Sequence, residues 1–234
     1  QGGTNTGSAP FGSGIYALCS EGQSVALTIE LIGTNTITGY YGIFLNAEID
    51  ASSYGTNATL TITGENNGSL GVSGSDHGIY VKSGTGNASI NIKNVAVTSS
   101  TNGNSAAGVY VMSSSTATNS PNISLSVDGG SLTASGTGSS DGILFYVGSS
   151  QATGATTSLT VTDNAIVRAE NGIKAGRVDK PTPSGTGIVF DGKNGTVYGD
   201  VTLQEDLEIG TDETLTIPEG ASLDTNGKTI TVES

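Results

Sequence analysis

A short pattern occurs six times along this chain: a glycine, a β-branched aliphatic residue and a third residue that is aromatic in four of the six copies. The first copy is Gly14-Ile15-Tyr16, and the steps to the later copies are 28, 36, 30, 34 and 30 residues. A repeat of nearly constant period indicates structural units that stack along one axis. The later copies are Gly42-Ile43-Phe44, Gly78-Ile79-Tyr80, Gly108-Val109-Tyr110, Gly142-Ile143-Leu144 and Gly172-Ile173-Lys174.

Each repeat contains three short runs in which apolar and polar residues alternate, as they do in half-buried β-strands. The first run of the third repeat, for example, places Ile79 and Val81 on one face. In the second repeat, Leu60 and Ile62 are the apolar residues of the second run, and residues 70–72 form the third run. Three strand-length runs per repeat predict an all-β fold, a right-handed parallel β-helix. We expect a solenoid of three parallel sheets with about 30 residues per coil.

Two segments of different composition flank the repeats, which we assign to residues 14–199. Residues 1–13 are rich in Gly, Ser and Thr, and we interpret them as a loose arm. After about residue 176 the runs return roughly every eight residues, and residues 200–234 carry nine carboxylates and one lysine. This acidic segment forms either further coils with tight corners, which we favour, or a small antiparallel cap. A polar cover at the end of a solenoid prevents end-to-end stacking.

The composition limits the classes of partner. The formal net charge is −13, which argues against nucleic acid and anionic membranes, because both attract basic patches. No apolar run is long enough to span a bilayer, so membrane insertion is not predicted. The single cysteine, Cys19, alternates with Ile15 and Ala17 and is therefore expected in the core. We expect an extracellular or surface-displayed monomer.

By the same alternation, the third residue of the repeated triplet is expected to point away from the core, in an outward column that contains four aromatic rings. An exposed aromatic stripe is an unusual use of surface, and flat rings hold the apolar faces of sugars. The alternative is that the rings stack on one another, or pack beneath the arm and the long turns. The candidate ligand-binding residues are Tyr16, Phe44, Tyr80 and Tyr110, with Lys82 and Tyr146 in the next outward column.

Three carboxylates lie at similar corners of different coils, just before the glycines: Asp76, Asp141 and Glu170. If they converge they would recruit Ca²⁺, which needs several clustered oxygens; the carboxylates of 200–234 are the alternative site. The only histidine, His77, is expected at the surface, and with no second His and only the core residue Cys19 no zinc site is predicted. No motif selects a catalytic pair of acids, so we predict no enzymatic activity and no required cofactor.

Several phrases resemble those of right-handed parallel β-helix proteins, among them Val127-Asp-Gly-Gly-Ser-Leu132 and Glu170-Asn-Gly-Ile-Lys174. They are similar to bacterial carbohydrate-binding β-helix domains that bind acidic polysaccharide with calcium. The tail from Asp200 to Val232 resembles segments of secreted, cell-surface proteins of anaerobic, gut-type bacteria. The Asp-Gly-Ile of the binding family is present here only at Asp141. The Gly-His-Gly and Arg-x-Lys motifs of the pectin-degrading polygalacturonases are not present.

These observations favour a non-catalytic extracellular protein that binds a polysaccharide or host glycan along its aromatic-bearing sheet. The second hypothesis is a structural stalk or adhesin module within a larger surface protein. The third is a polysaccharide lyase or hydrolase.

Overall fold

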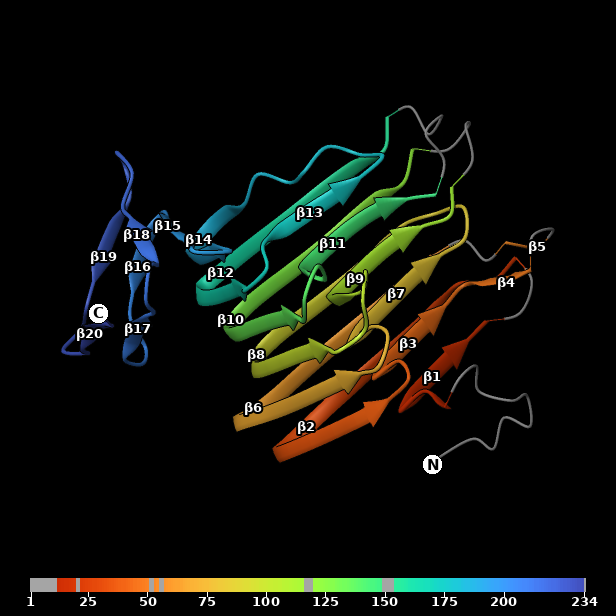
Figure 1. The fold of residues 1–234 in the computed structure, drawn as a ribbon, viewed down its shortest axis with the longest axis horizontal. Helices are drawn as coiled ribbons and strands as arrows, with labels where there is room; N and C mark the ends of the chain where they lie inside the picture. The colour runs from red at the N-terminus through yellow and green to blue at the C-terminus, as the bar shows by residue number, and fades with distance from the viewer. Residues whose placement is uncertain are drawn as a thin grey trace.

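The computed structural model describes residues 12–19, 22–50, 53–54, 57–115, 120–148 and 154–233. Its strands form a parallel β-solenoid with about 33 residues per turn, which confirms the predicted fold class. Figure 1 shows the coils stacked along one axis, with the last strands forming a smaller body at one end. Nearly all of the predicted arm, residues 1–13, lies outside the described part of the chain. Within that part, no helix has the length and apolar character needed to cross a membrane.

One sheet of the solenoid, here called the short-strand sheet, contains the six copies of the glycine triplet. Each strand pairs in parallel with the strand of the next coil, so that Ile15 pairs with Ile43 and Ile43 with Ile79. The predicted stacking of like residues is therefore confirmed. The strands, in spatial order, are β1 (Ile15–Leu18), β3 (Ile43–Asn46), β7 (Ile79–Ser83), β9 (Ala107–Ser113), β11 (Asp141–Val147) and β13 (Ile173–Gly176).

The second sheet, here called the long-strand sheet, contains both of the other runs. The sequence predicted two separate sheets for them, but each coil carries both runs in one continuous strand of 14 to 17 residues. Two hydrogen-bonded sheets therefore hold the three predicted runs. The long strands are β2 (Val25–Gly39), β6 (Ala58–Gly74), β8 (Ala88–Thr101), β10 (Asn122–Gly136) and β12 (Thr156–Ala169).

A β-bulge lies between the two runs of the long strands and explains why they looked separate. The pairing register shifts there, for example between Asp128 and Ser131 where β10 meets β12. Gly130 has a φ of 70°, and a Cβ atom on it would lie 2.4 Å from the carbonyl oxygen of Val95. Neighbouring coils place Asn94 and Asp163 at positive φ near the same bend. Short polar residues and glycine tolerate this conformation, so turn-like residues occur within a strand.

The core fills the space between the two sheets, as the alternation predicted. The inward residues of β7, Ile79 and Val81, are fully buried, as are Leu60 and Ile62 of β6. Cys19 is also buried and belongs to the same core.

A hairpin of β4 (Glu48–Asp50) and β5 (Ser53–Tyr54) follows β3 outside the coil.

The C-terminal region combines features of both alternatives considered from the sequence. Strand β14 (Ser184–Asp191) extends the long-strand sheet in parallel, and β15 (Asn194–Tyr198) then returns antiparallel to it. A smaller parallel coil follows, in which Asn194 pairs with Thr214, Asp200 with Ser222 and Leu207 with Ile230. Its steps are thus 20, 22 and 23 residues. Its strands are β16 (Asp200–Thr202), β17 (Leu207–Ile209), β18 (Thr214–Thr216), β19 (Ser222–Asp224) and β20 (Ile230–Val232).

This C-terminal coil has its own apolar core and is held against the solenoid by Arg168. Ile188, Phe190 and Val197 belong to that second core. The Arg168 guanidinium lies 3.8 Å from the centre of the Phe190 ring and donates to both carboxylate oxygens of Glu213, at 2.9 and 3.1 Å. Both of these contacts come from Nη1, while Nη2 donates to the backbone carbonyl of Glu208, so the partly buried guanidinium is held in one orientation between the two bodies.

Strand β13 is the last strand of the short-strand sheet, and part of its outer edge is covered by a side chain. The carboxylate of Asp191 accepts the backbone N–H of Ile173 at 2.7 Å, and the ammonium group of Lys180 binds the other carboxylate oxygen. A charged side chain at this position removes one donor that a further strand would need.

Candidate functional site

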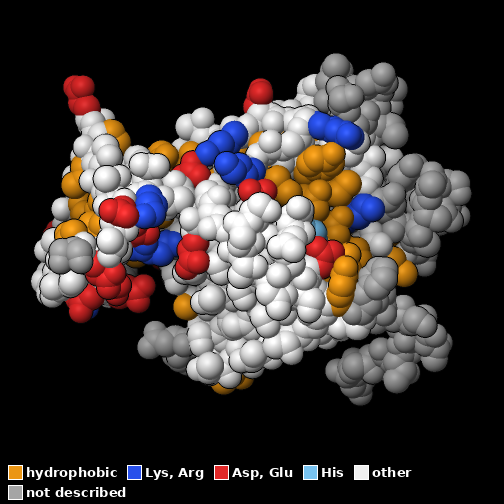
Figure 2. Space-filling model, viewed as in Figure 1, with side chains coloured by type: hydrophobic (Ala, Val, Ile, Leu, Met, Phe, Trp, Pro, Cys, Tyr) orange, Lys and Arg blue, Asp and Glu red, His pale blue; other side chains and the backbone are white. Residues whose placement is uncertain are grey.

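The outward aromatic column exists as predicted and forms a ladder of rings on the short-strand sheet. The Phe44 and Tyr80 ring centres are 4.7 Å apart, those of Tyr80 and Tyr110 are 4.8 Å apart, and each pair is inclined by only 8°. Tyr16 continues the ladder at 5.4 Å from Phe44 with a tilt of 37°. Figure 2 shows hydrophobic side chains gathered in a strip on this face, bordered by acidic and basic groups.

Stacking changes what the ladder can offer to a ligand. The faces of the Phe44 and Tyr80 rings are turned toward neighbouring rings, and only 6% and 8% of these residues is exposed. Little more than a ring edge of each is left for contact with a ligand, and the Tyr80 hydroxyl already donates to the sulfur of Met112. Because a sugar stacks on the face of a ring, these two rings are poorly placed to hold one. The geometry agrees with the alternative in which the rings stabilise the sheet.

The two other candidate residues of the column beside the ladder, Lys82 and Tyr146, lie two coils apart. In register, Lys82 pairs with Met112 and Met112 with Tyr146. The Tyr146 ring meets Tyr110 edge-on, at 6.3 Å between ring centres, and the Arg177 guanidinium lies 5.4 Å from its centre. Tyr146 is therefore partly covered, and the cations Lys82 and Arg177 lie on this side of the ladder.

On the opposite side of the ladder, at the corner before the glycines, His77 is buried, which corrects the expected surface position. Only 8% of the residue is exposed, and its ring contacts Tyr41, Tyr80 and Tyr110 with centres 4.8 to 5.9 Å apart. Its Nδ1 accepts the backbone N–H of Ala107 in the next coil at 3.0 Å.

Burial lowers the pKa of His77, and the nearby Asp76 carboxylate, 3.6 Å from Nε2, opposes the change. Asp76 also binds the Tyr41 hydroxyl, and burial together with this charge raises the pKa of Tyr41 to about 12. Since Nδ1 is an acceptor, the folded protein holds a neutral imidazole with its proton on Nε2.

This arrangement predicts a loss of stability in mild acid. The unfolded chain binds a proton at His77 below about pH 6.5, whereas the folded pKa is lower, so the free energy of unfolding falls as the pH drops through that range. The contribution of one proton cannot exceed about 1.4 kcal/mol per pH unit. We expect H77Q, which keeps an acceptor but does not titrate, to show a weaker dependence in urea unfolding between about pH 7.5 and 5.5. Equal slopes for the two proteins would contradict this assignment.

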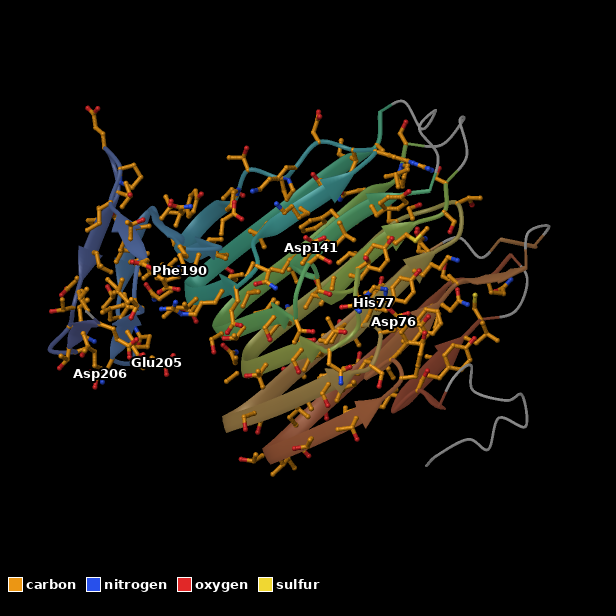
Figure 3. The ribbon with its side chains drawn as sticks, viewed as in Figure 1. Asp76, His77, Asp141, Phe190, Glu205 and Asp206 are labelled. Carbon is orange, nitrogen blue, oxygen red and sulfur yellow. The ribbon has the colours of Figure 1, made fainter. Side chains whose placement is uncertain are left out.

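The three carboxylates proposed for calcium do not form one site. Among the described residues no group of three or more His, Cys, Asp and Glu lies close enough to hold a metal ion, the acidic C-terminal coil included. Asp141 pairs in register with Ala107, whose coil separates it from the corner of Asp76. Asp141 instead lies near Lys174; burial raises its pKa and Lys174 opposes the change. Figure 3 shows Asp76, His77 and Asp141 on the solenoid, away from Glu205 and Asp206.

A groove that the sequence analysis did not identify, here called the hydroxyl groove, crosses the ends of the long strands beside this corner. Its volume is about 470 Å³. Consecutive coils contribute one hydroxyl each in register: Thr38 pairs with Ser73, Ser73 with Ser100, and Ser100 with Ser135. The lining residues are Thr38, Gly39, Ser73, Gly74, Ser75, Ser100, Thr101, Asn102, Ser135, Gly136, Thr137 and Glu170.

A sequence signal for the hydroxyl groove exists in retrospect. A hydroxyl residue followed by glycine ends the third run at Thr38-Gly39, Ser73-Gly74 and Ser135-Gly136. Tyr40 follows the first of these pairs and is 37% exposed. The groove therefore offers a hydroxyl about every 4.8 Å, with an accessible tyrosine next to its first member.

Two further grooves of about 490 Å³ each lie where the long strands face the acidic C-terminal coil. They share Ser131, Ile166 and Glu205. The carboxylate of Glu213 in this region is already occupied by Arg168, and that of Asp206 accepts the backbone N–H of Thr229 at 2.8 Å. These grooves mark the junction of the two bodies.

No family model matches this chain, and comparison with curated proteins and with solved structures likewise gives no match.

Proposed function

We propose that this chain is a non-catalytic extracellular or surface-displayed module that binds a polysaccharide or host glycan, and that it acts as a monomer. The observation that carries this proposal is the hydroxyl groove, with its regular series of side-chain hydroxyls beside the exposed Tyr40. The binding face that we propose is therefore the groove at the neighbouring corner of the coil, and not the ring ladder that the sequence suggested.

The groove suits an extended sugar chain for two physical reasons. Hydroxyl and amide side chains both donate and accept hydrogen bonds, which matches the hydroxyl groups of a sugar. The series Thr38, Ser73, Ser100 and Ser135 is held by paired strands, so little conformational entropy is lost on binding. Its repeat of about 4.8 Å is close to the length of one sugar unit in an extended chain.

Filling the groove tests the proposal. We expect S73F to weaken glycan binding by at least about tenfold, or about 1.4 kcal/mol, because the outward ring occupies the space of the ligand. A glycan array would identify a ligand, and calorimetry would measure its affinity for each variant. S126F is the matched control, since Ser126 also points outward from a long strand but does not line the groove. Equal affinities of the two variants would argue against the groove as the site.

A structural stalk or adhesin module is the second candidate. It is favoured by the ring ladder, whose members contact one another, and by the Asp191 cover of β13. If the glycan array detects no ligand, although cooperative unfolding shows that the protein is folded, this candidate is favoured. Release of reducing sugar or of unsaturated products from uronates would instead support a lyase or hydrolase and contradict the non-catalytic proposal.

A further inference from the structure

We infer that the hydroxyl groove selects an uncharged polysaccharide and disfavours uronate-containing chains. This inference rests on the proposed function and names the ligand class of the same site. It departs from the acidic polysaccharide that the family resemblance implies.

The charges around the groove carry the inference. Of the described residues that line it, the one charged side chain is Glu170, and its carboxylate is exposed. Asp76 lies on the adjacent corner, where it is bound to Tyr41. Lys82 and Arg177 lie on the strands and turn beyond the ring ladder, and Lys174 lies in the column of the ladder near Asp141; none of these three cations lines the groove.

A uronate chain in the groove would place carboxylates near Glu170, within a protein of formal net charge −13. Like charges at short range oppose binding, and salt weakens the effect for exposed groups. Calcium can bridge two sets of carboxylates, but the described residues contain no cluster of three acidic, His or Cys side chains to hold it. The remaining lining groups are hydroxyls, amides and backbone, which recognise neutral sugars.

The test compares polysaccharides that differ in charge. Calorimetric affinities would be measured for a neutral β-glucan, a neutral galactomannan and polygalacturonate, at about 20 and 300 mM salt. We expect a neutral polymer to bind at least about tenfold more tightly than polygalacturonate at low salt, with a smaller ratio at high salt. In E170Q the affinity for polygalacturonate relative to the neutral polymer should rise about fivefold at low salt. E219Q removes a carboxylate from the C-terminal coil and should leave the ratio unchanged.

Two results would overturn the inference. If polygalacturonate binds as tightly as the neutral polymers, and S73F removes both, the groove is a glycan site without charge selection, so the proposed function stands and the inference fails. If polygalacturonate alone binds and K82Q removes it while S73F does not, the ligand lies on the cation-bearing side of the ladder, and both the inference and the groove assignment fail.

Discussion

Replacing Gly78 by alanine is expected to lower the free energy of unfolding by about 3 kcal/mol, at the upper end of the usual cost of overpacking. A Cβ atom at this position would lie 2.3 Å from the hydroxyl oxygen of Ser99 and 2.6 Å from the carbonyl oxygen of Gly108. The second of these atoms belongs to the backbone of the next coil, which cannot move without disturbing the pairing of β7 with β9. Gly78 is thus required by the closeness of the coils.

A glycine in the same coil provides the control for this prediction. Gly71 lies in β6, and a Cβ atom there would meet no described atom closer than 3.9 Å. We expect G71A to unfold at nearly the same urea concentration as the parent protein, because removing glycine from a strand also reduces the entropy of the unfolded chain. Similar midpoints for G78A and G71A, followed by circular dichroism, would show that the triplet glycine has no steric role.

Truncating Tyr80 to alanine is expected to cost about 3–5 kcal/mol of folding free energy, the range seen when large buried aromatic side chains are removed. The ring is stacked between Phe44 and Tyr110, and it also contacts His77. Its loss would interrupt the ladder at its centre and leave a cavity beside the corner. Thermal and urea unfolding would measure the effect directly.

The matched variant is Y80F, which keeps the stacked ring and removes only the hydroxyl that donates to the sulfur of Met112 at 3.3 Å. We expect a cost below about 1 kcal/mol, because a thioether is a weak acceptor. If Y80A folds with parental stability and loses glycan binding, the ladder is a ligand platform and our structural interpretation of it is wrong.

The repeat and the alternation of apolar residues were sufficient to predict most of the fold. Pairing of Ile43 with Ile79, and the burial of Ile79 and Val81, follow from spacing alone, since like residues of successive coils must lie above one another. The sequence analysis left parallel coils and an antiparallel cap open and favoured the coils, so the chain reversal between β14 and β15 belongs to the less favoured alternative. Its short strands have the same alternation whether they pair in parallel or antiparallel, so pattern alone cannot separate the two.

The candidate site was less accessible from the sequence, because it depends on neighbours in other coils. The outward direction of Tyr80 was predictable, but the 8° inclination to Phe44, which leaves only ring edges exposed, was not. His77 is buried because the rings of neighbouring coils and the backbone of Ala107 surround it. The hydroxyl groove likewise arises only when Thr38, Ser73, Ser100 and Ser135 are placed in register.

The unequal lengths of the coils have a consequence for how this protein can be altered. Ile15 pairs with Ile43, 28 residues away, and Ile43 pairs with Ile79, 36 residues away. Loop-closure entropy grows only with the logarithm of length, so this difference costs about 0.2 kcal/mol. The turns at 102–105 and 137–139, which border the hydroxyl groove and are largely exposed, can therefore take insertions at little thermodynamic cost, whereas the corner of His77 and Gly78 is too closely packed. The stacked strands would serve as a constant frame, and libraries of new specificities could be built by varying those turns alone.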